Sequence, residues 1–141
     1  MNSENREKRS EIMRTVKSKH TKLEQKFYNG FGNEASRFSW NPQGIIGNPD
    51  FVNEECRVAI FLDSCFWHGC SRHFRLPKTN QVYWQEKIKR NKKRDRYVTK
   101  CLRNEGWTVF RIWEHAIRTE RDLTKSILLV SNHLKKVPSG V

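Results

Sequence analysis

The sequence VAIFLDSCFWHGCSRH, residues 58–73, joins a short apolar run to a loop rich in metal-binding side chains. The run Val58–Leu62 is continuously apolar, a pattern typical of a central strand that is covered on both faces. We therefore predict a strand over 56–62, preceded by a strand over 50–52 and followed by a long loop over 63–80. The polar groups of this loop are expected at one edge of the sheet.

The segments that follow this loop indicate an α/β fold. Residues 81–104 are predicted to form a helix that ends before Gly106, a residue type that commonly ends helices. Residues 107–113, WTVFRIW, are aromatic and β-branched and are predicted to form a strand. A strand, a helical crossover and a second strand form one unit, so the two strands are expected to be parallel.

Four further elements complete the predicted single domain, residues 1–141. Apolar spacing predicts a helix over 6–19 and a last helix over about 121–136. Thr21 is predicted to cap a second helix, because Glu24 stands three residues later in the position of a capping box. Residues 37–40 are predicted to form a short strand. The order of elements predicts a mixed central sheet with helices on both faces.

The helix predicted over 81–104 carries polar residues on its apolar face. Its sheet-facing stripe is Trp84, Ile88, Asn91, Asp95, Val98 and Leu102. A buried carboxylate is costly unless a partner holds it. Asp95 is therefore expected either to pair with a neighbouring arginine or to orient a catalytic imidazole or metal ligand from the loop.

The charge of the chain indicates a polyanionic partner. Lys and Arg number 28 against 15 acidic residues, a formal net charge of +13. Nine basic residues lie within 86–103 and seven within 1–22. Such clustering favours nucleic acid over a merely solvated helix face, with a membrane surface a distant third. We expect double-stranded DNA, with Arg14, Lys92 and Lys93 among its contacts.

The same chain lacks the signs of a membrane or secreted protein. The longest apolar run has five residues, far short of a span. The polar N-terminus does not resemble a secretory signal. We expect a cytoplasmic monomer, in which the four cysteines are thiols or metal ligands rather than disulfides.

The loop predicts a zinc site. Cys65-x4-Cys70-x2-His73 is compatible with the spacing of zinc ligands, and thiolate with imidazole is a typical ligand set. His115 is the better candidate for the fourth ligand, because it follows a strand that should end at the same edge of the sheet. His68 is the rival, since it is nearer in sequence. The alternative is a loop with two free thiols.

Two carboxylates predict a second metal site. Asp50 and Asp63 flank a predicted hairpin, which would bring them together at the sheet edge. Hard divalent cations such as Mg²⁺ take oxygen ligands and act on phosphates in nucleases. The alternative for Asp50 is a turn or cap residue. If zinc does not use His68, its imidazole is placed to activate the attacking water.

The rings of Phe66 and Trp67 stand between the predicted metal ligands. They either cover the core under the loop or act as a wedge between stacked bases. Met13, on the helix predicted over 6–19, would assist if that helix lies along DNA.

These segments resemble the very-short-patch-repair (Vsr) mismatch endonucleases. The matching motifs are RSEIMRTVKSKHTKLE, GNPDF, CFWHGC with a following His, YWQEKIKRNKKRDR and GWTVFRIWEHAIR. The resemblance implies a fold similar to type II restriction endonucleases, with a structural zinc, and Mg²⁺-dependent nicking of one strand beside a T:G mismatch in repair. Repair-protein partners are compatible with that role.

The resemblance also implies residue roles. Asp50 would bind Mg²⁺, His68 would be the general base, Asp95 its partner and Glu24 an auxiliary acid. Zinc would be held by Cys65, Cys70, His73 and His115, and the intercalating residues would be Phe66, Trp67 and Met13.

The chain departs from the best-known member at two positions before the zinc loop. Leu62 and Asp63 stand where that member has Thr and His. The Leu62 carbonyl would then replace the Thr as a metal ligand, and Asp63 would itself ligate Mg²⁺. The zinc loop is also shorter, with other ligand types. Two alternatives stay open: a homing or restriction-type nicking enzyme without mismatch preference, and a non-catalytic zinc-stabilised DNA-binding module.

Overall fold

The computed structural model describes residues 21–136 of the chain. The helix predicted over 6–19, with Met13 and Arg14, lies outside the described residues. Within the described part, no helix combines the length and apolar character needed to cross a membrane.

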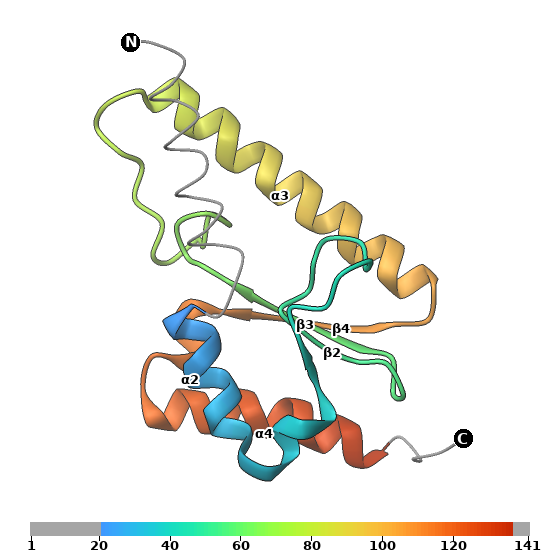
Figure 1. Cartoon of the computed structure of the whole chain (residues 1–141). Coiled ribbons are helices and arrows are strands. Elements are labelled where there is room, and N and C mark those ends of the chain that lie inside the picture. The colour runs from blue at the N-terminus through green and yellow to red at the C-terminus, as the bar shows by residue number, and fades with distance from the viewer. Residues whose placement is uncertain (1–20, 137–141) are drawn as a thin grey trace.

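A mixed four-stranded sheet forms the centre of the fold (Figure 1). Its strands, in spatial order, are β1 Ser39–Trp40, β2 Phe51–Asn53, β3 Val58–Asp63 and β4 Thr108–Trp113. β1, β2 and β3 pair in antiparallel fashion, whereas β3 and β4 pair in parallel. The predicted mixed sheet and the predicted parallel pair are therefore confirmed.

The strands begin or end one to two residues away from the bounds predicted from the sequence. Residues 54–57 form the turn between β2 and β3, and Arg57 has a φ of 54°. β3 therefore begins at Val58 rather than residue 56. It continues through Asp63, which was predicted to open the loop, because Asp63 still pairs in register with Trp113.

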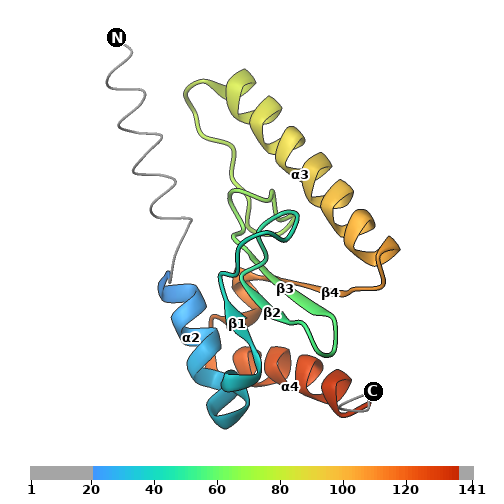
Figure 2. The same ribbon diagram turned by 45° about the vertical axis from the view of Figure 1, so that its right-hand side comes forward.

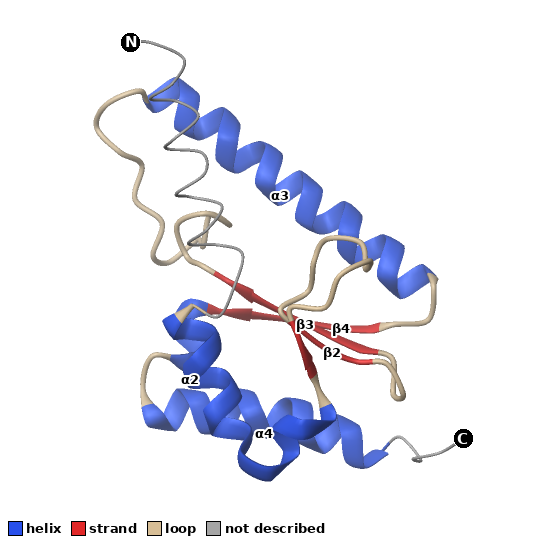
Figure 3. Ribbon diagram, viewed as in Figure 1, coloured by secondary structure: helices blue, strands red, loops and turns tan. Residues whose placement is uncertain are grey.

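Helices cover both faces of the sheet in the described part of the chain (Figures 2 and 3). α3 Gln81–Asn104 lies on one face, and α2 Lys22–Phe31 and α4 Glu120–Lys136 lie on the other. Short 3₁₀ turns, η1 Gly32–Arg37 and η2 Glu114–Ile117, follow α2 and β4. The predicted bounds of α3 are confirmed, and so is the capping box of Thr21 and Glu24 at α2.

Two apolar clusters fill the layers on either side of the sheet. The cluster facing α2 and α4 includes Phe27, Phe51, Val58, Ile60, Ile112, Ile117 and Val130. The cluster facing α3 contains Val52, Ala59, Phe61, Val98, Leu102 and Val109. Side chains alternate between the faces of a strand, so Asp63 shares the α3 face with Ala59 and Phe61. The last residue of the core strand thus carries a carboxylate towards α3.

Candidate metal centre and active site

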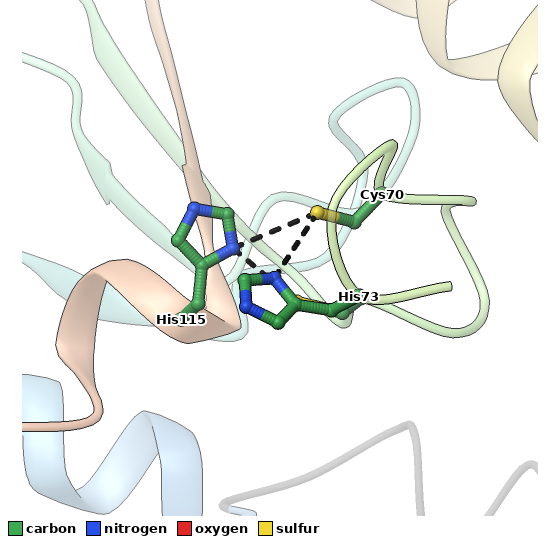
Figure 4. Close-up of side chains that lie close together, drawn as sticks. Cys70, His73 and His115 are labelled. Atoms are coloured by element: carbon green, nitrogen blue, oxygen red, sulfur yellow. Dashed lines mark hydrogen bonds between the residues drawn. The ribbon is translucent and has the colours of Figure 1, made fainter. Parts of the chain in front are cut away.

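Four donor groups gather at the edge where β3 and β4 end. The ligand atoms of Cys65, Cys70, His73 and His115 lie within 4.8 Å of one another. Nδ1 of His115 is 3.5 Å from Sγ of Cys65 and 3.6 Å from Sγ of Cys70. Nδ1 of His73 is also 3.6 Å from Sγ of Cys70. Figure 4 shows Cys70, His73 and His115 pointing towards one another.

These separations fit a tetrahedral zinc ion. Zinc bonds of about 2.3 Å to sulfur and about 2.0–2.1 Å to nitrogen place neighbouring ligand atoms about 3.6 Å apart. The distances between sulfur and nitrogen atoms in the cluster lie within 0.1 Å of that value. The cluster contains His115 and not the rival His68, because η2 directly follows the strand that is parallel to β3.

The loop that carries this cluster is tied to its neighbours through backbone groups. The Cys65 N–H donates to Oε1 of Glu114 at 3.0 Å, and the Cys70 N–H donates to the Cys65 carbonyl at 2.9 Å. Gly69 has a φ of 63°, and a Cβ there would lie 2.6 Å from Cγ2 of Ile88 and 2.4 Å from Cε of Lys92. The loop therefore packs tightly against α3 at Gly69.

Asp50 is hydrogen-bonded to the end of β3. Its Oδ2 accepts a hydrogen bond of 2.7 Å from the Leu62 N–H. Burial raises the pKa of Asp50 to about 7; the Leu62 N–H opposes this rise, and the carboxylates of Glu24 and Asp63 add to it. His68 is close enough to lower the same pKa. The end of β3 therefore links the two groups, because Asp50 is bonded to Leu62 and the next residue, Asp63, lies 3.7 Å from Nδ1 of His68.

His68 is held by a carboxylate of α3. Its Nδ1 lies 2.5 Å from Oδ2 of Asp95 and 3.7 Å from Oδ1 of Asp63. The amide of Asn91, the other polar residue of the α3 stripe, donates to the Trp67 carbonyl at 2.9 Å. Both polar residues on the apolar face of α3 are therefore explained by contacts with the loop.

Arg111 joins the same group and was missed by the sequence analysis. Its Nη1 donates to both oxygens of Asp63, at 3.0 and 3.2 Å, and lies 3.7 Å from Oδ1 of Asp95. Burial raises the pKa of Asp63, while His68 and Arg111 oppose the rise. The signal was present in the sequence: Arg111 shares the parity of Val109, so a charged side chain stands on the buried face of β4.

Glu24 is buried at α2 and makes structural contacts. Its Oε2 accepts hydrogen bonds from the N–H and the hydroxyl of Thr21, at 3.0 and 2.9 Å. Its Oε1 accepts one of 3.1 Å from the indole N–H of Trp40. The negative charge of Glu24 nevertheless reaches Asp50, whose pKa it raises.

The two loop aromatics lie in a larger ring cluster. The rings of Phe66 and Trp67 meet edge-on with centroids 5.2 Å apart. Both contact Trp84 of α3, at 5.3 and 5.7 Å, and Phe66 also packs against Phe74 at 5.6 Å. Trp84 was predicted to face the sheet; it packs against the loop instead. Phe66 and Trp67 stay partly exposed.

The predicted DNA contacts fall into two groups. Lys92 and Lys93 are exposed on α3, and the Lys92 side chain lies beside Gly69 of the loop. Met13 and Arg14 lie outside the described residues. The structure therefore places Lys92 beside the metal-binding loop and Lys93 on the surface of the same helix, and the other two predictions stand as they are.

Comparison with known proteins identifies close similarity to one group of nucleases. A family model described as "DNA mismatch endonuclease Vsr" matches residues 1–73. The chain is 35% identical over 121 residues to the DNA mismatch endonuclease Vsr of Escherichia coli (strain K12), covering 85% of this chain and 78% of that protein. It is 38% identical over 113 residues to the type II nicking enzyme V.NmeDIP of Neisseria meningitidis serogroup C, covering 79% and 76%.

A further relative is matched over a shorter part. The chain is 42% identical over 92 residues to the type II nicking enzyme V.NaeI of Lentzea aerocolonigenes, which is 65% of this chain. It spans 54% of the length of V.NaeI.

Proposed function

Because this chain belongs to the Vsr family and is a DNA endonuclease, we propose that it nicks one strand of duplex DNA beside a T:G mismatch, with Mg²⁺ as cofactor. The observation that carries the proposal is the contact between His68 and Asp95 near the end of β3, where Asp50 accepts a hydrogen bond from the Leu62 N–H. We also propose that residues 1–141 form one domain with a fold similar to restriction endonucleases, which the mixed sheet between helices supports.

Asp50 and the Leu62 main-chain carbonyl are the proposed Mg²⁺ ligands. Asp50 fits, because its carboxylate is partly buried among other acids and its pKa is raised to about 7, a state that a bound cation would relieve. The ion would polarise the scissile phosphate and stabilise the developing charge on its oxygens. The predicted role of Asp63 as a further ligand stays a prediction, since both of its oxygens already accept hydrogen bonds from Arg111.

His68 is the proposed general base. The carboxylate of Asp95 accepts a hydrogen bond from Nδ1–H of His68, which leaves Nε2 as the ring nitrogen that can take a proton from the attacking water. The water oxygen forms a bond to phosphorus while the bond to one bridging oxygen breaks. Asp95 also stabilises the imidazolium that results, as carboxylates do beside catalytic histidines. Glu24 is proposed to act as an auxiliary acidic group, because its negative charge raises the pKa of Asp50.

Cys65, Cys70, His73 and His115 are proposed to bind zinc in a structural role. All four positions of a tetrahedron are taken by protein groups, so the site leaves no position open for a substrate. The ion would fix the loop on both sides of His68 and so restrict its position.

The proposed DNA contacts include residues of the metal-binding loop and of α3. Phe66 and Trp67 are proposed to insert beside the mismatch, supported from behind by Trp84 and Phe74. Lys92 and Lys93 are proposed to contact phosphates. Met13 and Arg14 keep their predicted roles in DNA binding. The net charge of +13 suits this substrate.

A nicking enzyme without mismatch preference is the second candidate, because relatives such as V.NaeI and V.NmeDIP are named type II nicking enzymes. The non-catalytic module is disfavoured, since it gives no reason for a carboxylate on Nδ1 of His68.

The test is nicking of matched and mismatched duplexes by the wild type and by Asp50→Ala, with zinc measured on the same protein. We expect Mg²⁺-dependent nicking of the T:G duplex by the wild type alone, with DNA binding retained in the variant. Glu54→Ala is the control, because it removes an exposed acid from the far end of the β2–β3 hairpin. Equal nicking of matched DNA would favour the second candidate, and no cleavage with Mg²⁺ or Mn²⁺ would support the module.

A further inference from the structure

Arg111 is a partly buried arginine whose position is fixed on several sides. Its guanidinium carbon lies 4.1 Å from the centroid of the Phe61 ring. Its Nε donates a 2.7 Å hydrogen bond to the hydroxyl of Thr99 on α3. Its side chain is 20% exposed. A planar guanidinium held by a ring face and a fixed acceptor has little freedom to turn.

The remaining donors of this guanidinium reach the two acids beside His68. Nη1 donates to both carboxylate oxygens of Asp63. Nη2 donates to the main-chain carbonyl of Asp95 at 3.3 Å. Nη1 also lies 3.7 Å from Oδ1 of Asp95. The other oxygen of Asp95, Oδ2, contacts Nδ1 of His68. Arg111 therefore contacts one oxygen of the Asp95 carboxylate while the imidazole contacts the other.

The charges at this point require a cation. Asp63 is 5% exposed and Asp95 is partly buried, and both carboxylates lie within 4 Å of the same imidazole nitrogen. Two such acids beside one imidazole are unfavourable unless a positive group accompanies them. Arg111 supplies that group from β4, the neighbouring strand. One of its nitrogens, Nη1, donates to both oxygens of Asp63.

We propose that Arg111 is a positioning residue of the nicking reaction: it holds Asp95 against Nδ1 of His68, and Asp63 is the anchor that fixes Arg111. The proposal rests on the proposed function, because it assigns His68 and Asp95 to the reaction. It gives Asp63 a role that needs no metal ion, since Nη1 of Arg111 donates to both of its oxygens.

The kinetic test compares Arg111→Met and Arg111→Lys with the wild type on the T:G duplex. Misplacing a catalytic group by about 1 Å can cost about 100-fold in rate, so we expect a 10- to 100-fold lower single-turnover rate for Arg111→Met. DNA affinity, measured with Ca²⁺ in place of Mg²⁺, should not change. Arg111→Lys keeps the charge but not the fork of donors, and should recover only part of the loss. Arg121→Met, an exposed arginine of α4 on the opposite face of the sheet, is the control and should nick at the wild-type rate.

A second-site variant separates positioning from general damage. Asp63→Asn combined with Arg111→Met removes the acid together with its partner. If Asp63 acts only through Arg111, the Asp63→Asn change should cost nothing further once Arg111 is replaced, so the double variant should nick at the rate of Arg111→Met alone. A metal ligand at Asp63 would give a different result, a double variant slower than either single one.

A spectroscopic readout makes the inference independent of catalysis. In ¹⁵N-histidine-labelled protein without DNA, the wild type should show His68 with a protonated Nδ1 and an unprotonated Nε2. Arg111→Met should show both tautomers of the ring. If no duplex is nicked by the wild type, the proposed function fails while this measurement still decides the role of Arg111. The inference would be overturned if Arg111→Lys showed the wild-type tautomer of His68 and the wild-type nicking rate. The same two measurements on Arg111→Lys decide the question if Arg111→Met does not fold.

Discussion

Replacing Asp95 by Asn tests the proposed arrangement around His68 most directly. Oδ2 of Asp95 faces Nδ1 of His68 at 2.5 Å, and Oδ1 faces Nη1 of Arg111 at 3.7 Å. In Asp95→Asn the amide oxygen is expected to turn towards the cationic guanidinium, which leaves the amide N–H₂ directed at Nδ1. The imidazole must then accept at Nδ1 and carry its proton on Nε2, so it cannot take a proton from water.

The size of this effect follows from the change of tautomer. Carboxylate-to-amide substitutions beside catalytic histidines lower kcat by about 10⁴. Because Asp63 stays 3.7 Å from Nδ1 of His68 and can still favour a proton there, we expect a rate about 10³- to 10⁴-fold below that of the wild type. At 1.36 kcal/mol for each tenfold change, this equals about 4–5.5 kcal/mol of transition-state stabilisation.

The assay is single-turnover nicking of a labelled T:G duplex with Mg²⁺, combined with DNA affinity measured in Ca²⁺. The rate should fall while affinity and melting temperature stay near those of the wild type, because the substitution keeps the size of the side chain. Glu86→Gln removes an exposed acid from the same helix and should nick normally. An Asp95→Asn variant that nicks at the rate of Glu86→Gln would refute the role of His68 as base.

Three further predictions concern the scaffold. Cys70→Ser should lower the zinc content below one ion per chain and reduce the melting temperature, measured by metal analysis and calorimetry; equal zinc in variant and wild type would contradict the proposed ligand set. Gly69→Ala should destabilise the fold by about 2–3 kcal/mol, because strain at positive φ is joined by a clash with α3. Gly32→Ala, at φ 59° in open space, should cost only about 1 kcal/mol, so similar unfolding energies for the two would exclude the clash. Glu24→Ala should lower stability by about 1–2 kcal/mol in denaturant unfolding through loss of the cap at Thr21, and an unchanged midpoint would argue that Glu24 acts on Asp50 alone.

The patterns in the sequence predicted the framework because they depend on local physics. The apolar run of β3 and the uninterrupted helix of α3 are properties of neighbouring residues, as is the capping box at Thr21. The zinc-type cluster was predicted because parallel strands end at the same edge, which brings His115 to Cys65. The boundaries of β3 were off by one or two residues because the turn at 54–57 is set by pairing with β2.

The sequence by itself determined the α/β order of elements, the basic character of the chain and the residues of the metal-binding loop. Only the tertiary structure decided how the charges pair. Arg111 and Asp63 are 48 residues apart and meet diagonally across two strands, and no periodicity within either strand encodes that contact. The packing of Trp84 against the loop likewise depends on where residues 64–80 return to α3. Contacts between segments distant in sequence depend on the path of the whole chain, whereas helices, strands and caps depend on a few adjacent residues.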